Sequence, residues 1–153
     1  ALPIFDPFNF RDLLGGVRKQ PWDGLPPDTI MGHIHLHVAH LDEAERFYVD
    51  GLGFEVVSRY GGHALFVSTG NYHHHIGLNT WNGIGAPAPP ENSVGLREYT
   101  IVYPDSEARG KAIDRIKALG ASVTEKDGRM HTADPSGNRV VLLIEQEKEN
   151  GKP

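Results

Sequence analysis

The chain has 153 residues, which is about one domain and too few for two ordinary domains. Its formal net charge of −5 argues against nucleic-acid binding, which needs a clustered excess of lysine and arginine, and no apolar run is long enough to cross a membrane. The absence of cysteine excludes disulfides, zinc–thiolate sites and iron–sulfur clusters. We therefore expect a cytoplasmic protein that binds neither nucleic acid nor membrane.

The first thirty residues differ in composition from the rest of the chain. Residues 1–30 are rich in proline, phenylalanine and glycine, and they predict an N-terminal arm or connector with a short helix around residues 9–14. They lack the basic and apolar regions of a secretory signal. Aromatic side chains of this arm offer a surface for a second copy, so we expect a homodimer; the alternative is that the arm folds back on its own core. These side chains are Phe5, Phe8, Phe10 and Trp22.

Residues 31–145 repeat one order of elements twice. Module one, residues 31–82, predicts a strand, a helix and three strands, at residues 32–38, 41–53, 54–60, 63–69 and 72–79. Module two, residues 94–145, predicts the same order at residues 96–102, 105–120, 121–126, 129–133 and 139–145. Residues 146–153 form a charged tail. We predict an α+β fold in which two βαβββ modules pair mixed β-sheets around a shared metal cavity, with the helices outside.

The chain contains nine histidines, and most of them fall between residues 33 and 75. Alternate side chains of a strand share a face, so His33, His35 and His37 lie on one face of the first predicted strand. The repeat sets Glu98 of module two opposite His33. Glu145, near the charged end of the chain, is a reserve carboxylate.

Three consecutive histidines stand in the fourth predicted strand. The apolar residues that follow them belong under the helix, so alternation puts His73 and His75 on the opposite, polar face and turns His74 away. A one-residue bulge after Gly70 would exchange the roles of His74 and His75, because register decides the face. The side chains expected to contact a substrate from this polar region are His73, Asn79 and Trp81.

Two imidazoles and one carboxylate therefore converge from three strands. His33, His75 and Glu98 make the ligand set of a facial-triad site, which suits a divalent metal and leaves coordination positions open for a substrate. His35 and His37 are candidates to move protons as catalytic residues. The alternative is that these are hydrogen-bonded or exposed strand residues without a ligand role.

Two further segments predict local structure. Asp134–Asn138 has the composition of a tight hairpin turn. Gly85–Pro90 predicts a rigid linker between the modules, and it could also cap a pocket.

The motifs together resemble a known superfamily. GHIHLHVAHLDEAERFYVDGLGF, DPSGNRV and the two-module repeat resemble the vicinal oxygen chelate superfamily, which contains glyoxalase I, bleomycin-resistance proteins and extradiol dioxygenases. HHHIGLNTWNGIGAPAPP is more narrowly similar to the C-terminal half of bacterial catechol 2,3-dioxygenase-type proteins.

The resemblance implies a divalent metal that chelates two adjacent oxygens of a small-molecule substrate, usually Fe(II) in the dioxygenases. His33 and His75 match ligand positions of the superfamily, and Glu98 falls where the second module commonly carries histidine. The usual terminal carboxylate position falls at Val141, which cannot ligate a metal, so the resemblance implies at most a rearranged site.

Three functions follow in order of preference. The first is an extradiol-type dioxygenase that acts on a vicinal diol or catechol-like molecule. The second is a non-redox glyoxalase-like isomerase or lyase that uses the same ligands with Zn, Ni or Mn. The third is a small-molecule binding protein of the bleomycin-resistance type.

Overall fold

The computed structural model describes residues 9–16, 21, 23–90 and 92–148. The chain divides into two units, Ala1–Ile30 and Met31–Pro153. The first unit contains helix α1 (Phe10–Gly16), close to the position that the sequence predicts for a short helix. Phe5, Phe8 and Trp22, three of the residues expected to support a dimer, lie outside the described residues, as does most of the charged tail. Dimerisation therefore stays a prediction.

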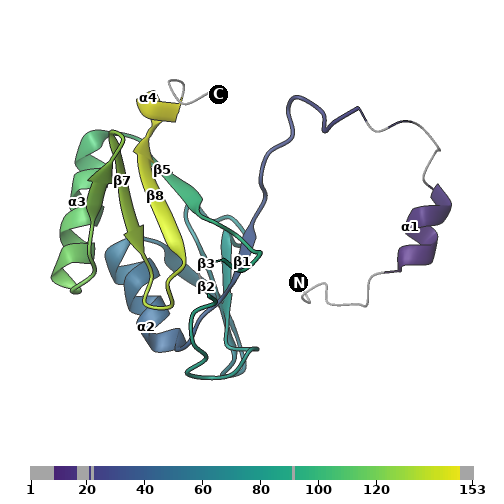
Figure 1. Cartoon of the computed structure of the whole chain (residues 1–153), viewed down its shortest axis with the longest axis horizontal. Coiled ribbons are helices and arrows are strands. Elements are labelled where there is room, and N and C mark those ends of the chain that lie inside the picture. The colour runs from purple at the N-terminus through teal and green to yellow at the C-terminus, as the bar shows by residue number, and fades with distance from the viewer. Residues whose placement is uncertain (1–8, 17–20, 22, 91, 149–153) are drawn as a thin grey trace. The chain divides into compact units, whose positions relative to one another are not determined.

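Two four-stranded mixed sheets build the second unit (Figure 1). The first sheet has the order β1-β4-β3-β2, with β1 (Ile34–His37), β2 (Glu55–Tyr60), β3 (Ala64–Ser68) and β4 (Ile76–Asn79). The second has the order β5-β8-β7-β6, with β5 (Tyr99–Tyr103), β6 (Thr124–Lys126), β7 (Arg129–Ala133) and β8 (Arg139–Ile144). β1–β4 and β5–β8 are parallel pairs, and the other pairs are antiparallel. The predicted α+β fold of two βαβββ modules is confirmed.

The predicted helix of module one is built in two parts. α2 (Leu41–Glu45) continues into η1 (Arg46–Gly51), whose wider turns are of the π type. The extra residue in such a turn changes which side chains face inward, and here the neighbours Phe47 and Tyr48 are both buried.

Module two has a longer regular helix, α3 (Ser106–Ala118), and the short α4 (Glu145–Lys148) follows β8. The side chain of Asp105 caps α3 by accepting a hydrogen bond of 2.8 Å from the Ala108 amide. α2 packs on β3 and β4, while α3 packs on β5, β8 and η1. Within the described ranges, every helix is too short or too polar to cross a lipid bilayer.

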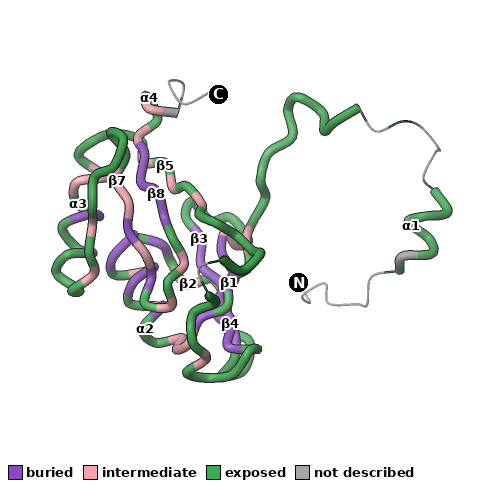
Figure 2. Tube along the Cα trace, viewed as in Figure 1, coloured by how far each residue is buried: buried purple, intermediate pink, exposed green. Residues whose placement is uncertain are grey.

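The two modules share one hydrophobic core. Figure 2 shows buried stretches along β3 and β8, one strand from each sheet. The Arg115 side chain on α3 donates a hydrogen bond of 3.0 Å to the carbonyl oxygen of Gly51 at the end of η1, so it links the helix of module two to the helix of module one. The largest fully buried side chains come from both modules: Tyr48, Leu65, Leu78, Ile116 and Leu142.

A buried polar network also crosses between the modules. The Tyr48 hydroxyl lies 2.7 Å from the Tyr99 hydroxyl and donates a hydrogen bond of 3.0 Å to the Asp134 carboxylate. Burial raises the pKa of Asp134 above its usual range, although hydrogen bonds from Asn138, Tyr48 and Ser136 oppose the shift. Because these groups are removed from water, each hydrogen bond satisfies a polar atom that would otherwise be costly to bury.

Candidate metal centre and adjoining cavity

The three consecutive histidines precede strand β4 instead of forming part of it. The sequence predicts a strand from Tyr72, but β4 begins at Ile76. Gly70 and Asn71 have φ angles of 61° and 58°, so a left-handed turn carries the chain into this region. Strict alternation therefore does not apply to His73 and His74, and the turn sets the directions of their side chains.

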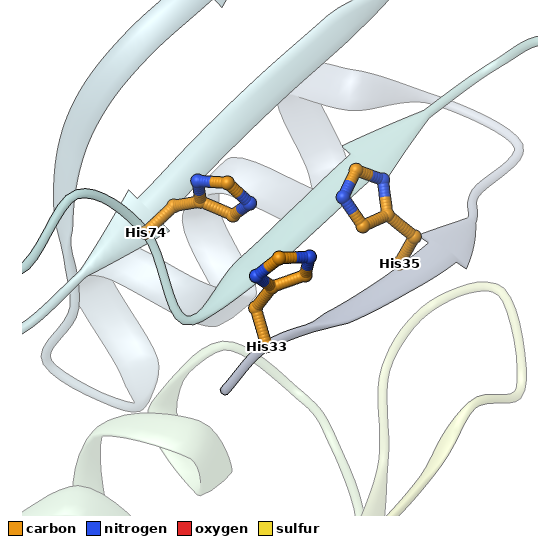
Figure 3. Close-up of side chains that lie close together, drawn as sticks. All are labelled: His33, His35 and His74. Carbon is orange, nitrogen blue, oxygen red and sulfur yellow. The ribbon is translucent and has the colours of Figure 1, made fainter. Parts of the chain in front are cut away.

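Three imidazoles from two segments meet beside β1. Figure 3 shows the rings of His33 and His35, from β1 and the residues before it, facing the ring of His74. Their ring centroids are 4.5 Å apart for His33 and His74, 5.4 Å for His33 and His35, and 5.7 Å for His35 and His74. One ligand nitrogen from each residue lies within 4.8 Å of the others. We call these residues the imidazole group.

A glycine on the neighbouring strand makes room for this group. Gly77 pairs with His35 across the parallel ladder, on the same face of the sheet. A Cβ atom added to Gly77 would lie 2.7 Å from Cε1 and 2.8 Å from Nδ1 of the His35 ring. Any side chain at position 77 would thus displace the imidazole, which gives this glycine a positioning role.

The environments of His74 and His35 favour neutral rings. Burial, followed by the neighbouring charges of His33, His73, His35 and His75, lowers the pKa of His74 to about 4. Burial and then His33 also lower the pKa of His35. A neutral imidazole keeps a lone pair on one ring nitrogen, which is the form that binds a metal.

The group fits a divalent metal. Nε2 of His74 is buried and has no hydrogen-bond partner within the described part of the chain, and such buried polar atoms are rare unless something else satisfies them. A metal held by His33, His35 and His74 would give the His74 ring a partner that the described residues do not supply. Imidazole ligands suit zinc, iron, nickel and copper, so the ligand type leaves the metal's identity open.

The structure places the other expected ligands outside the imidazole group. Nδ1 of His75 accepts a hydrogen bond of 3.3 Å from the Thr69 amide and lies 3.0 Å from the Ser68 hydroxyl. The His75 ring also stacks on Tyr72, with centroids 4.7 Å apart. Glu98 is exposed immediately before β5. The reserve carboxylate Glu145 begins α4 and is exposed as well.

The three expected substrate contacts have different settings. His73 is exposed, and its ring centroid is 4.6 Å from that of His74, so it borders the imidazole group. Asn79 is buried, and its Oδ1 accepts a hydrogen bond of 3.2 Å from the Trp81 amide. The Trp81 side chain is exposed.

A cavity of about 910 Å³ adjoins the imidazole group. His35 belongs to both, and His37 lines the cavity without belonging to the group. The linker that the sequence predicts at Gly85–Pro90 contributes five lining residues: Ala86, Pro87, Ala88, Pro89 and Pro90. The linker thus forms a wall of this cavity.

The Asp134–Asn138 turn connects β7 to β8, and it also forms hydrogen bonds with module one. The Asn138 side-chain amide donates a hydrogen bond of 3.2 Å to the His37 carbonyl oxygen, and the Ser136 hydroxyl accepts one of 2.8 Å from the Ala39 amide. The turn of module two thereby holds the end of β1 in module one. Sequence reasoning missed these residues and also Arg97 and Arg139, which line the cavity. A polar turn gives no local sign of a partner so far away in the sequence.

Comparison with known proteins identifies the family. Residues 30–142 match the family model of the Glyoxalase/Bleomycin resistance protein/Dioxygenase superfamily. The chain belongs to this superfamily. The sequence-based prediction of superfamily membership is therefore confirmed.

Relatives within the Glyoxalase/Bleomycin resistance protein/Dioxygenase superfamily include a curated dioxygenase. The chain is 50% identical over 122 residues to the protein named catechol-2,3-dioxygenase of Bacillus subtilis (strain 168), a match that covers 78% of this chain and 43% of that protein. The chain thus spans less than half the length of this relative.

Solved structures of the superfamily share the fold. A lactoylglutathione lyase from Agrobacterium tumefaciens has a TM-score of 0.56 and 26% identity, with 80% of this chain and 98% of that chain covered. Leishmania major glyoxalase I has a TM-score of 0.60 and 19% identity, with 80% and 91% covered, and this likeness shows the fold alone.

Proposed function

We propose that this chain is a metal-dependent dioxygenase of the extradiol type that acts on a vicinal diol of the catechol class. The imidazole group with its unpartnered His74 nitrogen is the observation that carries the proposal. The 50% identity to a protein named catechol-2,3-dioxygenase supports the reaction class. The cavity beside the group supports a small-molecule substrate.

His33, His35 and His74 would hold the divalent metal, for which Fe(II) is our first choice because of the dioxygenase relative. When bound, the metal would act as a Lewis acid on the two adjacent oxygens of the diol and would activate the ring that carries them for reaction with dioxygen. Extradiol cleavage places both atoms of one dioxygen molecule in the ring-opened product, so no further reductant is required.

The chain's own residues would bind and orient the substrate and move a proton. His37 lines the cavity outside the imidazole group, so its ring can accept a proton from a substrate hydroxyl and return it to the product. The apolar wall at Ala86–Pro90 would exclude water from one side of the substrate. His35 stands where the imidazole group meets the cavity, which would bring the diol end of a substrate next to the metal.

Oxygen uptake tests this proposal. Protein loaded anaerobically with Fe(II) is mixed with catechol and air-saturated buffer, and consumption of oxygen is followed together with metal content. We expect about one dioxygen consumed for each catechol by the wild type and by His63→Gln, which removes an exposed histidine outside the imidazole group. His74→Ala should lose both metal and uptake. Retention of full uptake by His74→Ala would overturn the proposed ligand set.

A second function has support of its own. Within the described part of the chain, the imidazole group consists of histidines alone, without a carboxylate. The chain also covers 98% of a solved lactoylglutathione lyase, with 26% sequence identity. A glyoxalase-like isomerase or lyase would use the same ligands with Zn, Ni or Mn and would need no oxygen. Anaerobic isomerisation of the adduct of a 2-oxoaldehyde with glutathione, without oxygen uptake on catechol, would favour this function. Protein that takes up no metal would instead favour a small-molecule binding protein.

A further inference from the structure

The cavity beside the imidazole group has walls from three separate segments of the chain. They are the end of β1, the segment that contains the linker (residues 82, 86–90 and 93–97), and the turn at residues 136–139. A Cβ atom added to Gly137 would lie 3.5 Å from the Ala88 side chain, so the linker and the turn are in close contact. Proline fixes its own φ angle, and Pro87, Pro89 and Pro90 therefore limit the freedom of the linker wall.

Hydrogen bonds hold the remaining walls together. Asn138 donates to the His37 carbonyl oxygen, and Ser136 accepts from the Ala39 amide. The Asp134 carboxylate in turn accepts hydrogen bonds of 2.9 Å from the Ser136 and Asn138 amides, which fixes the turn. The cavity is thus largely formed before any ligand arrives, which lowers the ordering cost of binding.

The charge of the cavity is opposite to that of the whole chain. The chain has 20 acidic and 15 basic residues, yet the described residues that line the cavity include two arginines, Arg97 and Arg139, and no aspartate or glutamate. Neither arginine forms an ion pair within the described part of the chain. A guanidinium group has planar donors that match the two oxygens of a carboxylate.

The apolar part of the lining completes the match to an aromatic acid. Val94 and Leu96 line the cavity together with the proline-rich wall and offer apolar surface for a flat ring. His35 belongs to both the cavity lining and the imidazole group, and Arg97 and Arg139 line the same cavity, so one ligand in the cavity can contact the arginines and the imidazole group together.

We propose that Arg97 and Arg139 select substrates with a carboxylate, so that the preferred class is an aromatic vicinal diol bearing an acidic substituent instead of unsubstituted catechol. The inference rests on the proposed function for the diol part of the substrate. The preference for the carboxylate rests on the cavity alone. It should weaken as ionic strength rises, because salt screens exposed charges.

Binding measurements with paired probes test the inference. Fe(II)-loaded protein is titrated anaerobically, without turnover, with 3,4-dihydroxybenzoate and with its neutral counterpart 3,4-dihydroxybenzamide. We expect the acid to bind about fivefold more tightly than the amide, which corresponds to roughly 1 kcal/mol from the two exposed arginines together. The double variant Arg97→Gln/Arg139→Gln should bring the ratio close to one. Arg129→Gln is the matched control, because it removes an exposed arginine that does not line the cavity.

A second titration separates this inference from the proposed function. Metal-free protein is titrated with benzoate and benzamide, which lack the diol, and the same preference for the acid is expected. A ratio near one in the wild type, or an unchanged ratio in the double variant, would overturn the inference even if oxygen uptake on catechol succeeds. If the wild-type protein cannot be loaded with metal but still prefers the acid, the arginine site stands and the proposed dioxygenase function is overturned.

Discussion

Gly77 provides a direct test of the imidazole group, because its substitution disturbs one ring without removing any polar atom. In Gly77→Ala the new Cβ would lie 2.7 Å from the nearest His35 ring atom. Carbon atoms in contact are ordinarily about 3.5–4.0 Å apart, so the ring must retreat by about 1 Å. Metal–ligand distances tolerate only about 0.2 Å, and His35 would then be unable to serve as a ligand in its present position.

We expect Gly77→Ala to weaken metal binding by about 10- to 100-fold, or about 1.4 kcal/mol for each factor of ten. The fold should survive, because the displaced atoms are at the end of a flexible side chain. Competition of the metal-free protein with a coloured chelator for Co(II) measures the affinity, and urea unfolding measures the stability. Gly62→Ala is the control, since nothing lies within 4 Å of its added Cβ. Undiminished affinity in Gly77→Ala would refute a ligand role for His35.

Three further predictions concern stability. Tyr48→Phe removes the hydroxyl between Tyr99 and Asp134, and urea unfolding should show a loss of about 1–3 kcal/mol because the buried Asp134 carboxylate loses one of its hydrogen-bond donors while Asn138 still donates to it. For His74, the pKa of about 4 lies below the unfolded value near 6.5, so the unfolded chain binds more protons between these values. Metal-free protein should therefore lose stability as the pH falls from about 7 towards 4, and His74→Gln should show a flatter dependence in urea unfolding at several pH values. Gly110→Ala, within α3 and with nothing within 4 Å of the added Cβ, should raise the unfolding free energy by about 0.5–1 kcal/mol.

The regular parts of the fold could be predicted because they depend on local periodicity. The repeat of strand, helix and three strands gave both modules, and alternation put His33 and His35 on the same face of β1, where both join the imidazole group. β7 has the same bounds as the strand predicted at residues 129–133, and β8 ends one residue before the end of the strand predicted at residues 139–145.

The third member of the imidazole group depends on a turn that the alternation rule does not describe. Gly70 and Asn71 adopt left-handed conformations, and the chain stays irregular until Ile76. His74 therefore enters the group, while Nδ1 of His75 is occupied by the Thr69 amide. The sequence allowed for this exchange as a bulge after Gly70, but only the geometry distinguishes between the two neighbours.

The cavity walls were also beyond sequence reasoning. Ser136 and Ala39 lie 97 positions apart in the chain, and their hydrogen bond forms only when the two modules meet. The arginines at positions 97 and 139 belong to different segments for the same reason, and neither has a local pattern that marks it as part of a site.

Metal titration of the metal-free chain tests the central claim most directly. The full chain is titrated calorimetrically with Fe(II), under anaerobic conditions, and with Zn(II), for the wild type, His74→Ala and the control His63→Gln. We predict about one metal ion bound for each chain in the wild type and in the control, and a loss of that binding in His74→Ala. Equal binding by His74→Ala and the wild type, or no binding by any of the three, would contradict the assignment of His33, His35 and His74 as a metal centre.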